Sequence, residues 1–227
     1  MRGNIGVIMR ILVINPNTSV DTTERIRLAA ERTASDGTII ETVTAPYGEK
    51  VIKTLENSAR AGEAVMSLLA ERASPVDAAV IAAYSDPGLQ QAKATYPYPA
   101  VGIGEASMLE AAAVSDRFSI VTMGRPMVGY LRERAIEYGV SDKLAGVRIL
   151  PWSVRAGRPS DVDDLTAECI AAIQHDGAGA VIIGGGPLAG FAEEISRAVM
   201  KPVLDGIVCA VHLAERMVRE RREKFAN

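Results

Sequence analysis

Two stretches of sequence about a hundred residues apart decide the fold. The first is DAAVIAAYSDPGL at residues 77–89, and the second is AGAVIIGGGPLAG at residues 178–190. In each, a short apolar run leads into a turn, a helical stretch and a short strand that begins at a proline, Pro99 or Pro202. The offsets agree, at 185 − 83 = 102 for the turns and 202 − 99 = 103 for the prolines. We therefore predict a duplicated unit and two similar halves that face each other.

Working outward from this repeat, apolar runs alternate with stretches of helical spacing. The expected strands are 11–15, 39–44, 78–83, 100–103, 118–123, 147–152, 180–183 and 203–204. The expected helices include 19–33, 57–72, 106–113, 127–137, 161–175 and 207–221. The central runs are apolar throughout, which is typical of strands that helices cover on both faces. The pattern predicts an α/β fold with parallel sheets built from βαβ units.

Composition narrows the class of protein. The chain has 227 residues, of which 48% are hydrophobic, and a formal net charge of −3. This length suits one large domain or two small ones that share a core. The charge predicts no nucleic-acid or anionic-membrane partner. No apolar run is long enough for a bilayer span and no secretory signal stands at the start, so we expect a cytoplasmic protein with a small-molecule substrate.

In parallel α/β folds, ligands bind at the carboxyl ends of the strands. Asn15, Asn17, Thr18 and Ser19 directly follow the first strand. Ser19 is a plausible N-cap, and the backbone N–H groups of this loop, with the Asn17 amide and the Thr18 hydroxyl, predict a nest for a carboxylate or carbonyl group. The alternative is a simple cap and turn without a ligand.

The remaining candidates also follow strands. The expected catalytic residues are Tyr84, Ser85 and Asp86 on one lip of the cleft, with Glu105 and Cys209 on the other. The expected substrate contacts beyond the first loop are Thr122, Gly185, Gly186, Asp205 and His212. Cys209 comes early in a helix, where the dipole would lower the pKa of a thiol, although a small buried residue is the alternative. There is no metal-binding motif, so we expect no metal site.

Four segments together resemble the hydantoin and allantoin racemases of the aspartate/glutamate/hydantoin racemase superfamily. They are INPNTS at 14–19, DPGL at 86–89, GIGEAS at 102–107 and PVLDG at 202–206, in the family's order. The resemblance implies two flavodoxin-like halves related by a pseudo-dyad, a cofactor-free cleft between them and a homo-oligomer. We place the first half at 1–105, completed by the C-terminal helix 207–227, and the second at 106–206.

The resemblance also implies a mechanism. In the family, each half supplies one cysteine at the end of a strand, and the two thiols act on opposite faces of the substrate's carbon acid. The matching positions here hold Ala83 and Gly185, which carry no proton. We therefore expect a cofactor-independent enzyme that acts on a small cyclic amide or a dicarboxylate by racemase-like isomerisation without thiols. A diverged hydrolase or decarboxylase, and a non-catalytic binding protein, are the alternatives.

Overall fold

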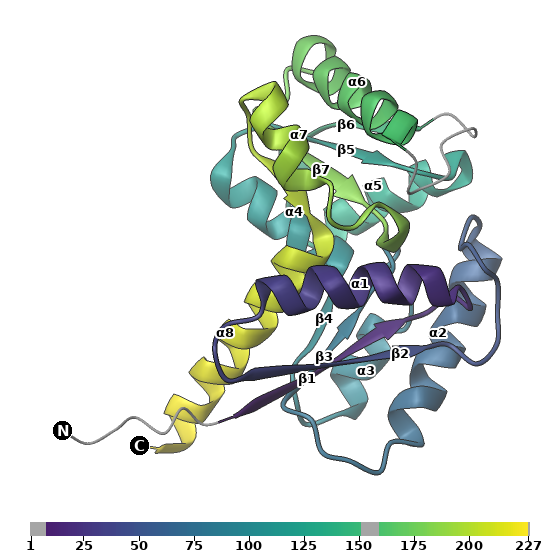
Figure 1. Cartoon of the computed structure of the whole chain (residues 1–227), viewed down its shortest axis with the longest axis vertical. Helices are drawn as coiled ribbons and strands as arrows, with labels where there is room; N and C mark the ends of the chain where they lie inside the picture. The colour runs from purple at the N-terminus through teal and green to yellow at the C-terminus, as the bar shows by residue number, and fades with distance from the viewer. Residues whose placement is uncertain (1–7, 151–158, 227) are drawn as a thin grey trace.

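The computed structural model describes residues 8–150 and 159–226, and their strands form two parallel four-stranded sheets (Figure 1). The first sheet, in the order β2-β1-β3-β4, consists of β1 (Met9–Asn15), β2 (Thr38–Thr44), β3 (Ala78–Ile81) and β4 (Ala100–Gly102). The second, in the order β6-β5-β7-β8, consists of β5 (Phe118–Thr122), β6 (Leu144–Ile149), β7 (Ala180–Gly184) and β8 (Val203–Asp205). The identical strand orders confirm both the α/β class and the two similar halves.

The strand registers show which residues of the two halves correspond. Ile81 pairs with Gly102 in the first sheet, and Ile183 pairs with Asp205 in the second. Gly102 and Asp205 therefore occupy equivalent positions. The bounds predicted from the sequence lie within three residues of the observed bounds for most strands. Residues 151–152 of the expected strand 147–152 lie outside the described residues.

Helices cover both faces of each sheet. In chain order they are α1 (Val20–Thr33), α2 (Leu55–Ala70), α3 (Leu89–Thr95), α4 (Ile103–Val114), α5 (Val128–Glu137), α6 (Pro159–His175), α7 (Ala192–Val199) and α8 (Gly206–Ala226). Short 3-10 turns stand at η1 (Arg125–Met127), η2 (Ser141–Lys143) and η3 (Gly186–Leu188). Apolar residues of α2 and α3 pack on one face of the first sheet, and those of α6 and α7 pack on one face of the second.

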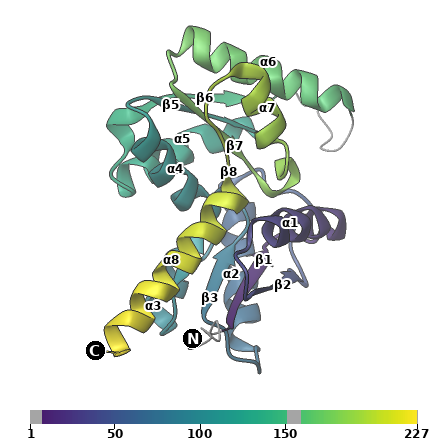
Figure 2. The same ribbon diagram turned by 60° about the vertical axis from the view of Figure 1, so that its left-hand side comes forward.

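The halves exchange their last helices. Helix α4 follows the first sheet in the chain but contacts β7 and β8 of the second, whereas α8 follows the second sheet but contacts β1, β3 and β4 of the first. Figures 1 and 2 show α8 running from one lobe along the other. One apolar core therefore extends through both halves, from Ile11 and Val80 to Ile120 and Ile182.

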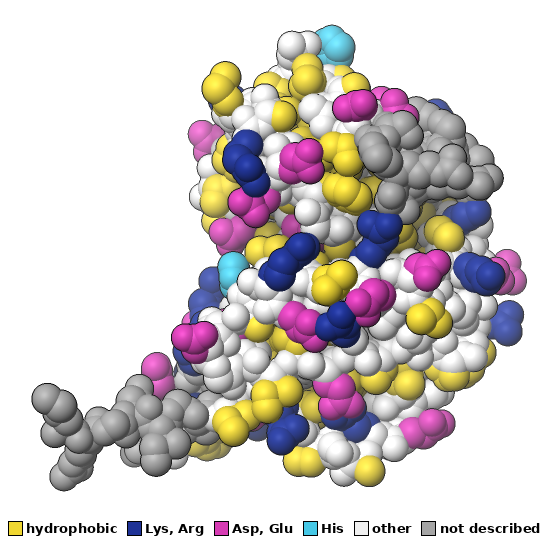
Figure 3. All heavy atoms as spheres, in the orientation of Figure 1, with side chains coloured by type: hydrophobic (Ala, Val, Ile, Leu, Met, Phe, Trp, Pro, Cys, Tyr) yellow, Lys and Arg dark blue, Asp and Glu magenta, His cyan; other side chains and the backbone are white. Residues whose placement is uncertain are grey.

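The visible surface carries no large patch of a single charge. On the face drawn in Figure 3, basic and acidic side chains are interspersed. Within residues 8–150 and 159–226, no helix combines the length and the apolar character needed to cross a membrane.

Glu215 anchors α8 to the first half. Its side chain is 1% exposed and accepts hydrogen bonds from the Ser35 N–H at 2.8 Å, the Ser35 hydroxyl at 2.6 Å and the Thr38 hydroxyl at 2.7 Å. We expect Glu215→Ala to lower the free energy of unfolding by about 2–4 kcal/mol, because it leaves these donors unpaired. Urea unfolding measures the change. The matched control is Glu220→Ala on the exposed face of α8, and equal stabilities of the two variants would refute this anchoring role.

Candidate functional site

A cavity of about 890 Å³ lies where the carboxyl ends of both sheets meet. Segments that follow strands of both halves contribute to its lining. They are Asn17 after β1, residues 50–53 after β2, 82–85 at the end of β3, 122–124 at the end of β5, Leu150 after β6 and 184–187 at the end of β7. Helix α1 adds a side wall. This placement follows from parallel topology, which collects the strand ends at one edge.

The structure brings half of the predicted site residues to this cavity. Those that line it are Asn17, Ser19, Tyr84, Ser85, Thr122, Gly185 and Gly186. Those that do not are Asn15, Thr18, Asp86, Glu105, Asp205, Cys209 and His212. Ala83 also lines the cavity, as does Gly185, the corresponding residue of the second half. These are the two positions at which the resemblance implied a cysteine.

The loop after β1 is not the open nest that the sequence suggested. The Asn17 N–H bonds to Asn15 Oδ1 at 3.2 Å, the Thr18 N–H to the Glu49 carbonyl at 3.0 Å, and the Ser19 N–H to Asn17 Oδ1 at 2.9 Å. Because protein acceptors already occupy these donors, the nest prediction is wrong for them. Ser19 caps α1 as predicted, with its hydroxyl accepting from the Thr22 N–H at 3.3 Å.

Asn15 is a support for this loop instead of a ligand contact. It is fully buried, and its Nδ2 group donates to Asn17 Oδ1 at 3.0 Å, to the Ser19 carbonyl at 3.1 Å and to the Thr23 hydroxyl at 2.9 Å. These bonds fix Asn17, whose amide remains on the cavity wall.

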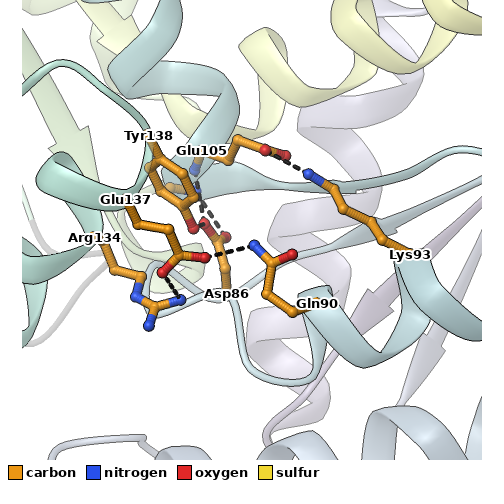
Figure 4. A network of polar contacts seen from close by, with 8 residues as sticks. Asp86, Gln90, Lys93, Glu105, Arg134, Glu137 and Tyr138 are labelled. Atoms are coloured by element: carbon orange, nitrogen blue, oxygen red, sulfur yellow. Dashed lines mark hydrogen bonds and ion pairs between the residues drawn. The ribbon is translucent and has the colours of Figure 1, made fainter.

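Asp86, expected to be catalytic, is a helix cap (Figure 4). Its Oδ1 accepts from the Gly104 N–H at 2.9 Å, and its Oδ2 accepts from the Glu105 N–H at 2.7 Å and from the Tyr138 hydroxyl at 2.8 Å. Burial raises the pKa of Asp86 to about 7, against the opposing effect of these hydrogen bonds. The carboxylate satisfies the first turn of α4 and joins it to Tyr138 of the second half.

Three other predicted site residues, Glu105, Asp205 and His212, also lie outside the cavity lining. Glu105 forms an ion pair with Lys93 (Figure 4). Asp205 is the counterpart cap, since its oxygens accept from the Gly190 N–H at 2.6 Å and the Ile207 N–H at 2.8 Å. His212 lies exposed on α8.

Neither cysteine is a candidate for catalysis. Cys209 belongs to the core that joins the halves, and burial raises the pKa of its thiol to about 12. The expectation that the helix dipole would lower this pKa is therefore wrong, because desolvation outweighs the dipole. Cys169 is also buried, and burial raises its pKa to about 12 as well. These are the only two cysteines of the chain, and neither lines the cavity.

The Tyr84 side chain belongs to the first half and contacts the second half. A Cβ atom placed on Gly184 would lie 2.8 Å from carbons of the Tyr84 ring, so the ring packs directly on the end of β7. Burial raises the pKa of Tyr84 far above its ordinary value. The phenol therefore stays protonated and does not act as a base at neutral pH.

Sequence reasoning missed the contributions of α1 and of the segment at 50–53, here called the 50–53 loop. Asp21, Glu24, Arg25 and Leu28 line the cavity from α1, and Lys50, Val51, Ile52 and Lys53 line it from the loop. The loop also approaches the second half, because a Cβ on Gly124 would lie 3.8 Å from Lys53 Cα. The sequence held one signal for this loop, which is that it follows a strand of the predicted parallel sheet.

The two walls of the cavity differ in chemistry. All five charged residues in the described lining belong to the first half. The second half lines it with glycines, Pro187 and an apolar group made of Met123, Met127, Leu131 and Leu150. The one hydroxyl in the described lining of this half, on Thr122, donates to the Gly184 carbonyl at 2.7 Å. The described part of the second half thus offers no ionisable side chain to a ligand. Among the described residues, no cluster of histidine, cysteine or carboxylate side chains could hold a metal ion.

Known proteins share this architecture. The sequence matches the Asp/Glu/Hydantoin racemase family over residues 11–214. It is 34% identical to a hydantoin racemase of Paenarthrobacter aurescens over 92% of this chain and 91% of that protein. The structure of an allantoin racemase from Klebsiella pneumoniae superposes with a TM-score of 0.89 at 36% identity, covering 93% of this chain and 88% of that one. An allantoin racemase from Pseudomonas fluorescens gives 0.89 at 31% identity, with 93% and 91% covered.

The two-half α/β fold of this chain, with its cavity at the strand ends, is therefore the fold of these racemases. The chain belongs to the Asp/Glu/hydantoin racemase family.

Proposed function

We propose that the protein is a cofactor-independent enzyme that acts on a small cyclic amide or dicarboxylate in this cavity, without thiol chemistry. Family membership and the named relatives, which are racemases of cyclic amides, support the ligand class. One observation carries the mechanistic part of the proposal: Ala83 and Gly185 both line the cavity, whereas both cysteines are buried elsewhere.

The backbone at Gly185 supports the same proposal. Its φ of +133° belongs to a region that residues with a side chain rarely adopt. A cysteine at this position would be strained even though the space beside it is open. The second half is thus adapted to glycine in its backbone as well as in its sequence.

The asymmetry of the walls bears on the reaction. Racemase-like isomerisation requires a base on one face of the carbon and an acid on the other. The described residues of the second-half wall supply neither, whereas the first-half wall carries the carboxyl groups of Asp21 and Glu24 and a Tyr84 that is held protonated. Ring hydrolysis would require a base to activate water, for which Asp21 and Glu24 of the first-half wall are the candidates. Decarboxylation forms the carbanion by loss of CO₂ and requires a proton donor on one face alone, so these walls favour it over isomerisation. Non-thiol isomerisation remains the alternative reaction.

A second candidate function is non-catalytic binding. The observation in its favour is the uncharged floor of the cavity, formed by Asn17, Ala83, Ser85, Thr122 and residues 184–186. Such a floor binds a neutral polar ring as readily as it supports a reaction.

Turnover in D₂O distinguishes these functions. Enantiopure 5-substituted hydantoins, allantoin and 2-substituted malonates serve as substrates, and NMR follows deuterium at the carbon acid and the loss of CO₂. We expect CO₂ loss with deuterium delivered to one face. Deuterium with inversion would indicate isomerisation, and binding without turnover would indicate the binding function.

Paired variants locate the reaction. Ala83→Phe fills the cavity and is expected to abolish turnover or binding, whereas Ala59→Phe, on the exposed face of α2, is expected to change neither. Iodoacetamide should leave the native activity intact, because both thiols are buried and protonated. Full activity of a folded Ala83→Phe protein would contradict the assignment of the cavity.

A further inference from the structure

A second cavity, of about 440 Å³, lies at the edge of the first sheet where its strands begin. Residues 76–77 and 97–98 line it from the segments that directly precede β3 and β4, and Val218, Arg221, Arg222 and Phe225 line it from the end of α8. We call this cavity the α8 groove. None of the described residues lines both cavities, because the first cavity lies at the opposite edge of the sheet.

The charges of the α8 groove do not cancel. The Asp77 carboxylate accepts from the Arg222 guanidinium at 2.8 Å and from the Arg10 N–H at 2.8 Å. Both of its oxygens are therefore engaged. In the part of the chain that the structure describes, Arg221 has no carboxylate partner, and a guanidinium keeps its charge at any physiological pH. The described lining thus carries one positive charge in excess.

Aromatic rings accompany this charge. The Arg221 guanidinium lies over the Phe225 ring, 5.6 Å from the ring centre. This stacking leaves the N–H groups at the edge of the guanidinium free to donate. Phe225 itself is 80% exposed, which is unusual for a phenylalanine. A ligand that covered this ring would bury apolar area that water now contacts.

The sheet side of the groove is held in place by packing. The Tyr98 ring stacks on the Tyr96 ring, with centroids 5.4 Å apart and an angle of 21° between the planes. Tyr96 does not line the groove, so it supports Tyr98 from behind. Val218 is buried and adds an apolar contact from α8. The groove therefore combines supported apolar surface with a single unpaired cation.

This combination restricts the class of ligand. Cavities for small molecules have volumes of about 300–1,000 Å³ and are lined mainly by apolar side chains with a few polar groups, as this groove is. A cation would face the charge of Arg221, and a neutral ring would leave that charge unpaired. A carboxylate pairs with a guanidinium through two parallel hydrogen bonds. An attached apolar group would then reach the aromatic rings.

We propose that the α8 groove binds a small monocarboxylate with an aromatic or branched apolar body. In this site Arg221 binds the carboxylate, and Phe225 and Tyr98 contact the apolar body. The groove is separate from the cavity at the carboxyl ends of the strands, so the inference does not depend on the proposed function.

Backbone amide NMR of the unmodified full chain tests where such a ligand binds. With phenylacetate as the probe, saturable shifts should appear at residues 76–77, at residues 97–98 and in the last turns of α8, with a dissociation constant on the order of a millimolar. The same shifts should appear in Ala83→Phe, in which the first cavity is filled. Shifts confined to the lining of the first cavity, or no saturable shifts, would overturn the proposal.

Two further probes test the chemistry of the ligand. Phenylacetamide keeps the ring but has no charge, and acetate keeps the charge but has no ring. Each should bind about tenfold more weakly than phenylacetate at the same residues. Equal affinity for phenylacetamide would overturn the role of the carboxylate, and equal affinity for acetate would overturn the role of the apolar body.

Variants of α8 test the named side chains. Arg221→Gln should weaken phenylacetate binding about tenfold, and Arg221→Lys, which keeps the charge but not the planar donor group, about threefold. Phe225→Ala should weaken it about threefold to fivefold. The matched control is Arg216→Gln, which removes the same charge from an exposed position of α8 outside the groove and should bind like the unmodified protein.

Both Arg221 and Phe225 are exposed, so these variants are expected to fold, and far-UV circular dichroism checks the helix content. Equal affinities of folded Arg221→Gln and Arg216→Gln would overturn the assignment of Arg221. None of these measurements involves turnover, so their result is independent of the reaction in the first cavity.

Discussion

Exchanging two residues, Asp86→Gly together with Gly102→Asp, is expected to restore stability that each single change destroys. Gly102 in the first half corresponds to Asp205 in the second. The Asp205 carboxylate caps α8, the helix that follows it, whereas the carboxylate that caps α4 after Gly102 comes from Asp86. A Cβ on Gly102 would overlap the carboxyl group of Asp86. The two halves thus place a carboxylate in the same position from different points of the chain.

The single variants should therefore be severely affected. Gly102→Asp alone forces a second carboxylate into a filled, buried site and should cost about 3–5 kcal/mol. Asp86→Gly alone leaves the first turn of α4 without its cap and should cost about 1–3 kcal/mol, although glycine suits the positive φ of +47° at this position. The exchange reproduces the second-half arrangement, and Gly102, with φ −93° and ψ 146°, already has the backbone of an N-cap.

Urea unfolding of the four proteins gives the coupling free energy. We expect the exchanged protein to fall within about 1 kcal/mol of the unmodified one. Additive losses in the double variant would refute the equivalence of the two caps. Ala59→Gly, on the exposed face of α2, is a control for the entropic effect of an added glycine.

The second large effect concerns pH. Asp86 ionises at a pKa of about 7 in the folded protein, against an ordinary value of 3.8. Because its pKa is raised on folding, the folded state binds the extra proton between these values. The contribution to stability is therefore complete below about pH 3.8 and is lost as the pH rises to about 7. Each tenfold change in an ionisation constant corresponds to about 1.4 kcal/mol, so the loss would reach about 2–4 kcal/mol.

Comparison with Asp86→Asn isolates this effect, since asparagine does not titrate. The difference in unfolding free energy between the two proteins should decrease from pH 5 to pH 7 and then become constant. Glu215 and Asp176 have lowered pKa values, so their effects appear only at more acidic pH. A difference that instead grew with pH would mean that the three hydrogen bonds to Asp86 outweigh its burial.

The sequence was sufficient for the fold because its signals were local and repeated. The apolar runs, the prolines at 99 and 202 and the offset of about a hundred residues marked both sheets and their relation. The same reasoning placed Asn17, Ser85 and Gly185 at the cavity, because each follows a strand. Neighbouring positions such as Asp86 share that location but differ in the direction of the side chain. That direction depends on a φ of +47° and on the distant N–H groups of α4.

The burial of individual side chains could not be predicted from the sequence either. Cys209 stands early in a helix, which favours a reactive thiol, but contacts from both halves enclose it and reverse the expected pKa shift. The sequence also did not predict that the two walls of the cavity differ in charge. It arises because α1 and the 50–53 loop bring charges to one side, while Met123, Met127, Leu131 and Leu150 converge on the other.

The exchanged helices have a consequence for synthesis. Helix α8 is synthesised after both sheets, yet it covers the sheet that is synthesised first. Until then, the apolar residues of β1 and β3 that face α8 have no partner, so the nascent first half cannot complete its core. The first half consequently completes its core only after the second half has been synthesised, so neither half is an independent folding unit although the two share one strand order.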